Sequence, residues 1–174
     1  SQWPFTCNKH GKPEITKLSG LPEIEFNITH TRGLCACVVA MDAQVGIDAE
    51  DINRQCNYKK LSQRMFSKEE DILLDSSDEP SVQFYKFWTL REAYVKALGT
   101  GLSGSSKEFY FTLSKNDEGI SIHHSNKLEV DTDCQFALYL PTAAHVMSVA
   151  IKKKRGVSVQ IKQVIINEVL SILA

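Results

Sequence analysis

The hydrophobic pattern of this chain changes period once along its length, and that change limits the folds it can adopt. From residue 81 to 98, the segment SVQFYKFWTLREAYVKAL has apolar residues three and four apart, and Gly99 and Gly101 follow it, as at the end of a helix. After Gly101 the apolar residues alternate, which predicts strands at 107–113, 120–124, 134–140, 145–152 and 158–166. One long helix followed by several strands indicates an α+β domain, in which helix 81–98 packs across an antiparallel sheet formed mainly by the later strands.

The first half of the chain adds earlier strands and two shorter helices. Apolar alternation predicts three strands, at 24–30, 34–41 and 45–50. The four residues 41–44 could turn a hairpin between the last two of these strands. Helical spacing at 58–66 is followed by Ser67 and Glu70, which fit a capping box that begins a second helix. Residues 167–174 are interpreted as a short closing helix.

Composition places the chain among globular proteins with a core. Of its 174 residues, 43% are hydrophobic and 24% are charged, and the formal net charge is −1, whereas nucleic-acid-binding proteins usually show a basic excess. No apolar run approaches the roughly 18 residues of a membrane span, and the first residues lack the basic-then-apolar order of a secretory signal. The five cysteines do not form a zinc-binding pattern. We therefore expect reduced thiols, a cytoplasmic protein and no nucleic-acid or membrane partner.

Three carboxylates stand close together where the strand at 45–50 should leave the core. They are Asp48, Glu50 and Asp51 in the segment VGIDAEDINR. Carboxylates this close repel one another, and they need a solvated turn, a partner cation or a metal. Residues two apart on a strand share a face, so Asp48 and Glu50 should point the same way while Ala49 turns to the core. Asp51 would begin the solvated exit.

The long helix offers a third carboxylate for this face. Trp88, Glu92 and Lys96 are spaced by four and form one stripe. A mainly apolar stripe lies beside it, made of Phe84, Phe87, Arg91, Tyr94 and Leu98. The simplest interpretation is an ordinary surface pair between Glu92 and Lys96. The alternative joins Glu92 to Asp48 and Glu50 around one Mg²⁺ ion, which takes a few carboxylate oxygens, keeps waters and completes its shell with substrate phosphate.

Two short segments indicate a phosphate ligand. HGKP at 10–13 is a turn that carries a cation, and FNITH at 26–30 ends a strand with a hydroxyl and an imidazole. Each is weak alone, because a single histidine is more often structural and a GKP turn is more often only a turn.

The order of five segments is more specific than any one of them. HGKP, FNITH, GIDAE, FSKEE and WTLREAYVKALGTGL follow one another between about residue 10 and residue 103. This order resembles the 4′-phosphopantetheinyl transferases of the larger class, which serve siderophore, polyketide and nonribosomal peptide synthetases and some fatty-acid systems. The resemblance implies two pseudo-symmetric subdomains. Residues 1–54 would be the remainder of the first, with the turns that contact coenzyme A, and residues 55–174 the second, with the catalytic helix and sheet.

The resemblance also implies a reaction. A serine hydroxyl on an apo acyl or peptidyl carrier protein attacks the β-phosphate of coenzyme A, the phosphopantetheine arm moves to the serine, and 3′,5′-ADP leaves. Such transfers depend mainly on positioning and charge neutralisation. Mg²⁺ would be the cofactor and coenzyme A the co-substrate. The sequence favours neither a monomer nor a dimer.

Individual roles follow from the same resemblance. The metal ligands would be Asp48 and Glu92, with Glu50 as a third ligand or water holder. The catalytic residues would be Glu92, Lys96 and Asp48, with Glu92 taking the serine proton directly or through water. Glu70 would support the site. Coenzyme A would be contacted by six residues: Lys12 and Pro13 at the nucleotide end, Thr29 and His30 at a phosphate, and Arg91 and Lys96, of which Lys96 reaches the pyrophosphate.

Several departures from the family pattern keep other interpretations open. Thr29 stands where the family has Ser, Arg91 where it has Lys, and Ala49 where it has Ile or Val. Members of this class also carry a longer segment before the GKP turn, so we expect a fragment or processed chain, a first subdomain completed by a second chain, or a compact variant. The alternatives are an inactive relative that binds carrier proteins and a magnesium-dependent phosphohydrolase or nuclease.

Overall fold

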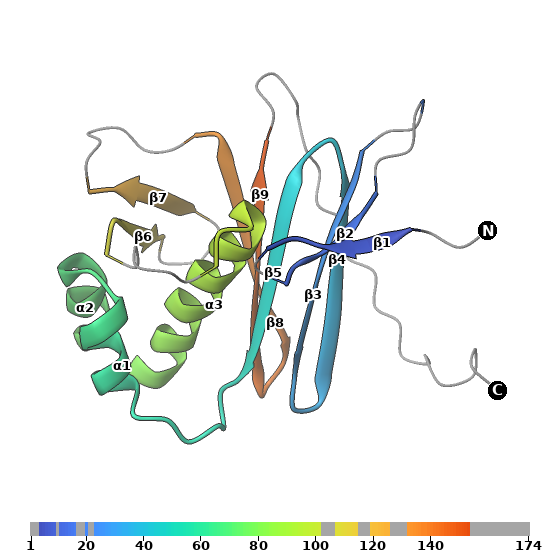
Figure 1. Cartoon of the computed structure of the whole chain (residues 1–174). Helices are drawn as coiled ribbons and strands as arrows, with labels where there is room; N and C mark the ends of the chain where they lie inside the picture. The colour runs from blue at the N-terminus through green and yellow to red at the C-terminus, as the bar shows by residue number, and fades with distance from the viewer. Residues whose placement is uncertain are drawn as a thin grey trace.

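A three-stranded antiparallel sheet forms the middle layer of the protein (Figure 1). The computed structural model describes residues 4–9, 11–16, 20, 23–101, 107–114, 119–125 and 132–153. In the sheet, β9 (His145–Lys152) lies between β5 (Gln44–Asp51) and β8 (Cys134–Thr142). Asp48 is paired with Ser148 in the register of β5 and β9. β5 therefore has one edge bonded to β9 and one edge without a partner strand in the described residues.

Helix α3 (Pro80–Leu98) covers one face of this sheet (Figure 1). Pro80 occupies the first turn, where its missing N–H costs no hydrogen bond, and Gly99 ends the helix in the left-handed conformation with φ of 66°. The main core lies between helix and sheet, and its buried members include Phe84, Phe87, Leu90, Ala93, Val146 and Ala150. The predicted α+β fold, with helix 81–98 packed on an antiparallel sheet, is confirmed.

A β-hairpin covers the opposite face of the sheet (Figure 1). It consists of β3 (Ile24–Thr31) and β4 (Leu34–Met41), joined by a turn at Arg32 and Gly33. Its inner side and the sheet enclose a second core that includes Val45, Ile47, Ala49, Val149 and Ile151. The predicted hairpin at 41–44 is wrong, because β4 pairs with β3 whereas β5 pairs with β9.

The remaining elements surround these layers. β1 (Phe5–Cys7) pairs with β2 (Pro13–Ile15), and β6 (Phe109–Leu113) pairs with β7 (Ile120–His124). Helices α1 (Tyr58–Met65) and α2 (Lys68–Asp75) precede α3. The predicted capping box is confirmed, because the Ser67 side chain accepts from the Glu70 amide and the Glu70 carboxylate accepts from the Ser67 amide. The strand predicted at 158–166 and the helix predicted at 167–174 lie outside the described residues.

None of the helices in the described ranges is long and apolar enough to cross a membrane. The boundary predicted between subdomains at residue 54 stays a prediction. The pairing of β5 with β9 joins the two segments on either side of it in one sheet.

Candidate functional site

The site is formed where helix α3 crosses strand β5, and a glycine makes that crossing close. A Cβ atom placed on Gly46 would lie 2.1 Å from the Ala93 carbonyl oxygen and 2.4 Å from the Ala97 amide nitrogen. The helix backbone therefore rests directly on the strand at this point. Since side chains alternate along a strand, Asp48 and Glu50 share the face of Gly46 that meets the helix. The crossing brings Glu92 and Lys96 to the same place.

Asp48 is the most enclosed carboxylate of this group, with 6% of the residue exposed. Its Oδ1 atom accepts hydrogen bonds from Lys96 Nζ at 2.6 Å and from Thr29 Oγ1 at 3.5 Å. Its buried Oδ2 atom has no hydrogen-bond partner among the described residues. Burial raises the pKa of Asp48 to about 6, the Lys96 ammonium opposes this rise, and the charge of Glu50 adds to it.

Glu92 is partly buried beside Asp48 and is affected by its charge. Burial raises the pKa of Glu92 to about 7, and the carboxylates of Asp48 and Glu50 raise it further, against the effect of Lys96. Three carboxyl groups from a strand and a helix thus act on one another at the crossing. The structure brings together the residues that the sequence hypothesis placed there.

The fit of a metal ion to this group depends on its donor atoms. No set of three or more His, Cys, Asp or Glu side chains within the described ranges is arranged to hold a metal as it stands. Two features still suit a cation: the unpartnered Oδ2 of Asp48 and the mutual repulsion of Asp48 and Glu92. Glu50 is also 3.6 Å from Arg54 Nη1, so part of its charge is already balanced.

Side chains close the edge of β5 that has no partner strand. Asn27 Oδ1 accepts from the Ile47 amide at 3.0 Å, and Thr29 Oγ1 accepts from the Ala49 amide at 3.3 Å. Lys96 Nζ donates to the Ile47 carbonyl at 3.1 Å. Sequence reasoning did not assign Asn27 or Gly46 to the site. A polar residue inside an apolar strand pattern and a glycine inside a strand were the available signals.

Lys12 and Thr29, which were expected to contact coenzyme A, have partners inside the protein, and their contacts with coenzyme A stay predictions. Lys12 Nζ donates to the Val45 carbonyl at 3.1 Å and lies 3.6 Å from Glu25, so it is engaged inside the protein and its side chain is only 10% exposed. The Thr29 hydroxyl is likewise buried between Asp48 and Ala49. Both side chains bind β5, because their polar atoms satisfy its backbone or its carboxylate.

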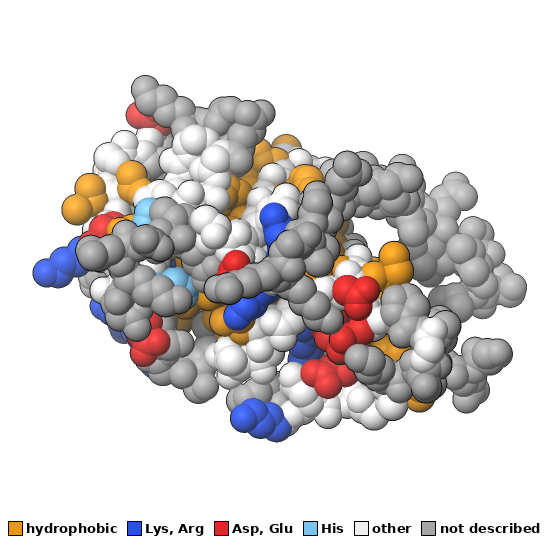
Figure 2. Space-filling view, turned by 90° about the horizontal axis from the view of Figure 1, so that it is seen from above, with side chains coloured by type: hydrophobic (Ala, Val, Ile, Leu, Met, Phe, Trp, Pro, Cys, Tyr) orange, Lys and Arg blue, Asp and Glu red, His pale blue; other side chains and the backbone are white. Residues whose placement is uncertain are grey.

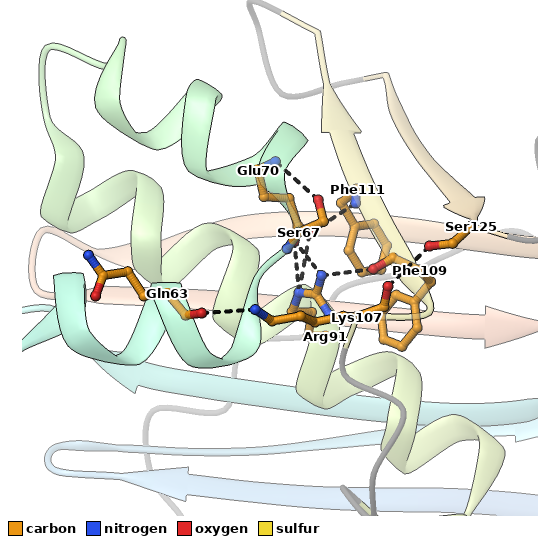
Figure 3. Close-up of polar contacts among 8 residues, drawn as sticks. All are labelled: Gln63, Ser67, Glu70, Arg91, Lys107, Phe109, Phe111 and Ser125. Carbon is orange, nitrogen blue, oxygen red and sulfur yellow. Dashed lines mark hydrogen bonds and ion pairs between the residues drawn. The ribbon is translucent and has the colours of Figure 1, made fainter.

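Arg91 lies in a buried network with Glu70 (Figure 3). Its guanidinium forms an ion pair with the Glu70 carboxylate and donates to the Phe109 carbonyl at 2.8 Å. Glu70, with no exposed surface, also accepts from the Phe111 amide at 3.0 Å. Donors of Arg91 are directed to α2 and β6, and a coenzyme A contact from Arg91 stays a prediction. The expected support of the site by Glu70 stays a prediction, and this network is the route by which Glu70 would give it.

His30 and Pro13 are the other two residues that were expected to contact coenzyme A, and these contacts stay predictions. His30 is exposed, and strand alternation puts it on the opposite face of β3 from Thr29. Pro13 is partly buried in β2, and His10 of the HGKP turn lies outside the described residues. The residues gathered at the crossing are Asp48, Glu50, Glu92, Lys96 and Thr29.

The sequence model of the 4′-phosphopantetheinyl transferase superfamily matches residues 44–150, more than half of the chain. "4′-phosphopantetheinyl transferase Sfp" of Bacillus subtilis (strain 168) is 36% identical over 102 residues, covering 57% of this chain and 42% of that protein. "4′-phosphopantetheinyl transferase gsp" of Aneurinibacillus migulanus is 32% identical over 127 residues, covering 72% and 49%. The chain thus spans about half the length of the curated relatives it matches.

Two solved structures have a similar fold. The holo-[acyl-carrier-protein] synthase of Thermotoga maritima aligns with a TM-score of 0.51 and 24% identity, covering 64% of each chain. The holo-[acyl-carrier-protein] synthase of Neisseria meningitidis aligns with a TM-score of 0.50 and 15% identity, covering 64% of this chain and 98% of that one. At these identities the likeness shows the arrangement of helix and sheet.

Proposed function

This chain belongs to the 4′-phosphopantetheinyl transferase superfamily, and from that premise we propose that it transfers the phosphopantetheine arm of coenzyme A to a serine of an apo acyl or peptidyl carrier protein. The other product is 3′,5′-ADP. One observation carries the proposal: the α3–β5 crossing brings together Asp48, Glu92 and Lys96, which are far apart in the sequence and all match the family motifs. The named relatives support the same activity.

A magnesium ion is part of this proposal. Asp48 and Glu92 would hold it through carboxylate oxygens, with Glu50 as a third ligand or the acceptor for a bound water. When bound, the ion would polarise the pyrophosphate of coenzyme A and offset the charge that develops on the leaving group. The unpartnered Oδ2 of Asp48 supports this assignment.

Glu92 is the proposed proton acceptor. Without a bound cation, burial and the neighbouring carboxylates raise the pKa of Glu92 to about 7. A bound cation would lower this pKa, so Glu92 would be ionised and able to accept a proton at neutral pH. Its place on a rigid helix would let it take the proton of the carrier serine directly or through one water. Asp48 contributes by adding negative charge next to it, which keeps Glu92 basic.

Lys96 supplies positive charge to the same place. Its ammonium donates to Asp48 Oδ1 and to the Ile47 carbonyl, and its side chain is 31% exposed. It can therefore approach a phosphate oxygen from the solvent side. On the described part of the face shown in Figure 2, Lys and Arg side chains are scattered and mixed with Asp and Glu. Phosphate binding at a surface of this kind depends on local cations rather than on a broad basic patch.

The proposal is tested by incubating the chain with coenzyme A, Mg²⁺ and apo carrier proteins, followed by intact-mass measurement of each carrier. We expect a competent carrier to gain one phosphopantetheine arm, with an equal amount of 3′,5′-ADP released. A carrier whose acceptor serine is replaced by alanine, and a reaction with EDTA, are the controls. Cleavage of coenzyme A without carrier modification would instead indicate a phosphohydrolase. Carrier binding without turnover would indicate an inactive relative.

A further inference from the structure

The strand that carries Asp48 is held on its open edge by side chains rather than by another strand. The backbone N–H and C=O groups of successive residues alternate between the two edges of β5. Those of residues 46, 48 and 50 point toward β9, and those of Ile47 and Ala49 point to the other edge. The acceptors on that other edge are Asn27 and Thr29 of β3. The two capped amides immediately precede and follow Asp48.

Asn27 is built into this position. It is 5% exposed although it is an amide, and strand alternation turns it, with Thr29, toward β5. Ile47 is itself buried, so its N–H has no access to water and needs an acceptor inside the protein. The Asn27 carbonyl oxygen supplies it at 3.0 Å. Replacing this acceptor by an apolar group of similar size would leave a buried N–H unpaired.

Loss of the Asn27 acceptor would affect the site through the backbone of β5. Ile47 receives two contacts on this edge, because Asn27 accepts from its amide and Lys96 donates to its carbonyl. The same Lys96 ammonium binds Asp48 Oδ1. A shift of β5 away from β3 would therefore alter both the place of Asp48 and the contact with Lys96.

We propose that Asn27 is a positioning residue that, together with Thr29, fixes β5 by its open edge and so holds Asp48 in place for transfer. Its role in holding the strand stands on the geometry alone, and its effect on the reaction rests on the proposed function. Asn27 acts through Ile47 and does not contact substrate.

The test compares Asn27→Leu, which removes the acceptor at similar volume, with Thr31→Val as a matched control. Thr31 lies on the same face of β3 and makes no hydrogen bond to β5 within the described residues. Amide hydrogen exchange by NMR is measured on the full chain. We expect the Ile47 amide to exchange at least about tenfold faster in Asn27→Leu than in the wild type. The Gly46 amide, which is directed to β9, should keep its wild-type rate in Asn27→Leu, and the Ile47 amide should keep its wild-type rate in Thr31→Val.

Kinetics provide the second measurement. In Asn27→Leu we expect kcat for transfer to fall about 10- to 100-fold with the KM for coenzyme A unchanged, since the geometry of Asp48 is disturbed while no ligand contact is removed. Unchanged exchange at Ile47 would overturn the proposal. Faster exchange with unchanged kcat would overturn the positioning role.

Two further outcomes are separated by the design. If the wild-type chain shows no transfer, the proposed function is contradicted. The exchange rate of the Ile47 amide would still decide whether Asn27 holds β5. If Asn27→Leu does not fold, Asn27→Ser is measured in the same way. The serine hydroxyl is too short to reach the Ile47 amide from this position. A wild-type exchange rate at Ile47 in Asn27→Ser would overturn the proposal.

Discussion

At Asp48 a carboxylate is buried with one oxygen bound to Lys96 and the other without a partner in the described residues. Glu92 lies close enough for its pKa to be raised by the charge of Asp48. Lys96 therefore balances the buried Asp48 and the partly buried Glu92, with Glu50 adding further negative charge. Such an arrangement is unfavourable for stability when all three are ionised, and a bound cation would remove most of the conflict.

Stability should depend on pH in a direction fixed by these raised pKa values. Asp48 and Glu92 titrate in the folded chain at about 6 and about 7, whereas the unfolded chain loses these protons near pH 4. The folded state thus binds more protons between these limits, so the free energy of unfolding falls as pH rises from about 4 to about 7. With EDTA, urea denaturation should show this fall in the wild type and a weaker fall in Glu92→Gln. The same dependence of stability on pH in both proteins would contradict the raised pKa of Glu92.

Magnesium provides a check on the same interpretation. A cation that binds the folded chain through ionised carboxylates should raise its free energy of unfolding more at pH 8 than at pH 5. In Glu92→Gln this increase should be largely lost. An equal effect of magnesium on both proteins would place its binding elsewhere.

The buried pair of Arg91 and Glu70 should be needed for stability rather than for coenzyme A affinity. Arg91→Met leaves the Glu70 carboxylate buried without its cation, so we expect a loss of about 3 kcal/mol in the free energy of unfolding. The double variant Glu70→Gln/Arg91→Met should recover much of this loss. Arg64→Met, at an exposed position of α1, should stay within about 0.5 kcal/mol of wild type. Wild-type stability in Arg91→Met would contradict the structural role.

At the scale of elements, the site depends on how closely helix α3 approaches strand β5. Gly46 gives the helix backbone room, and Ala93 and Ala97 keep the helix side of the contact small. This spacing decides whether Glu92 and Lys96 reach Asp48. The motif glycine is therefore a packing requirement with a direct consequence for the carboxylate group.

Gly46→Ala should separate the helix from the strand. The added methyl group would meet backbone atoms at 2.1 and 2.4 Å, so α3 must move, at a cost of about 1–3 kcal/mol in stability. Transfer should fall about 100-fold because Glu92 is displaced from Asp48. Gly119→Ala, whose nearest neighbours are Ser114 side-chain atoms at 3.2 Å, is the control for both measurements. Wild-type transfer in Gly46→Ala would show that the close crossing is not required.

The elements that local patterns determine were predictable, and the contacts between distant edges were not. Period and end signals predicted α3, and the Ser67–Glu70 spacing predicted the start of α2. The hairpin at 41–44 was mispredicted because β-pairing partners are chosen by the whole fold, here β9 for β5. The cations of Lys12 and Arg91 were assigned to a ligand from their motifs, but only the tertiary structure shows their internal acceptors.

At the scale of the whole molecule, the described residues form three layers. Helix α3 lies on one side of the central sheet and the β3–β4 hairpin on the other (Figure 1). β9 contributes residues to both cores, β5 contributes Val45, Ile47 and Ala49 to the second core, and the open edge of β5 is bound by side chains from β3 and α3. The site thus arises where all three layers meet, and each layer contributes to the place of Asp48.

The central claim is that Asp48 on the strand and Glu92 on the helix act as one unit in transfer. A double-mutant cycle in single-turnover transfer to one competent carrier measures this directly, with Asp48→Asn, Glu92→Gln and the double variant. We predict that each single variant loses at least about 1000-fold in rate and that the double variant loses little more than the worse single one, because either change disables the same unit. Losses that multiply in the double variant, or a wild-type rate in either single variant, would contradict the claim.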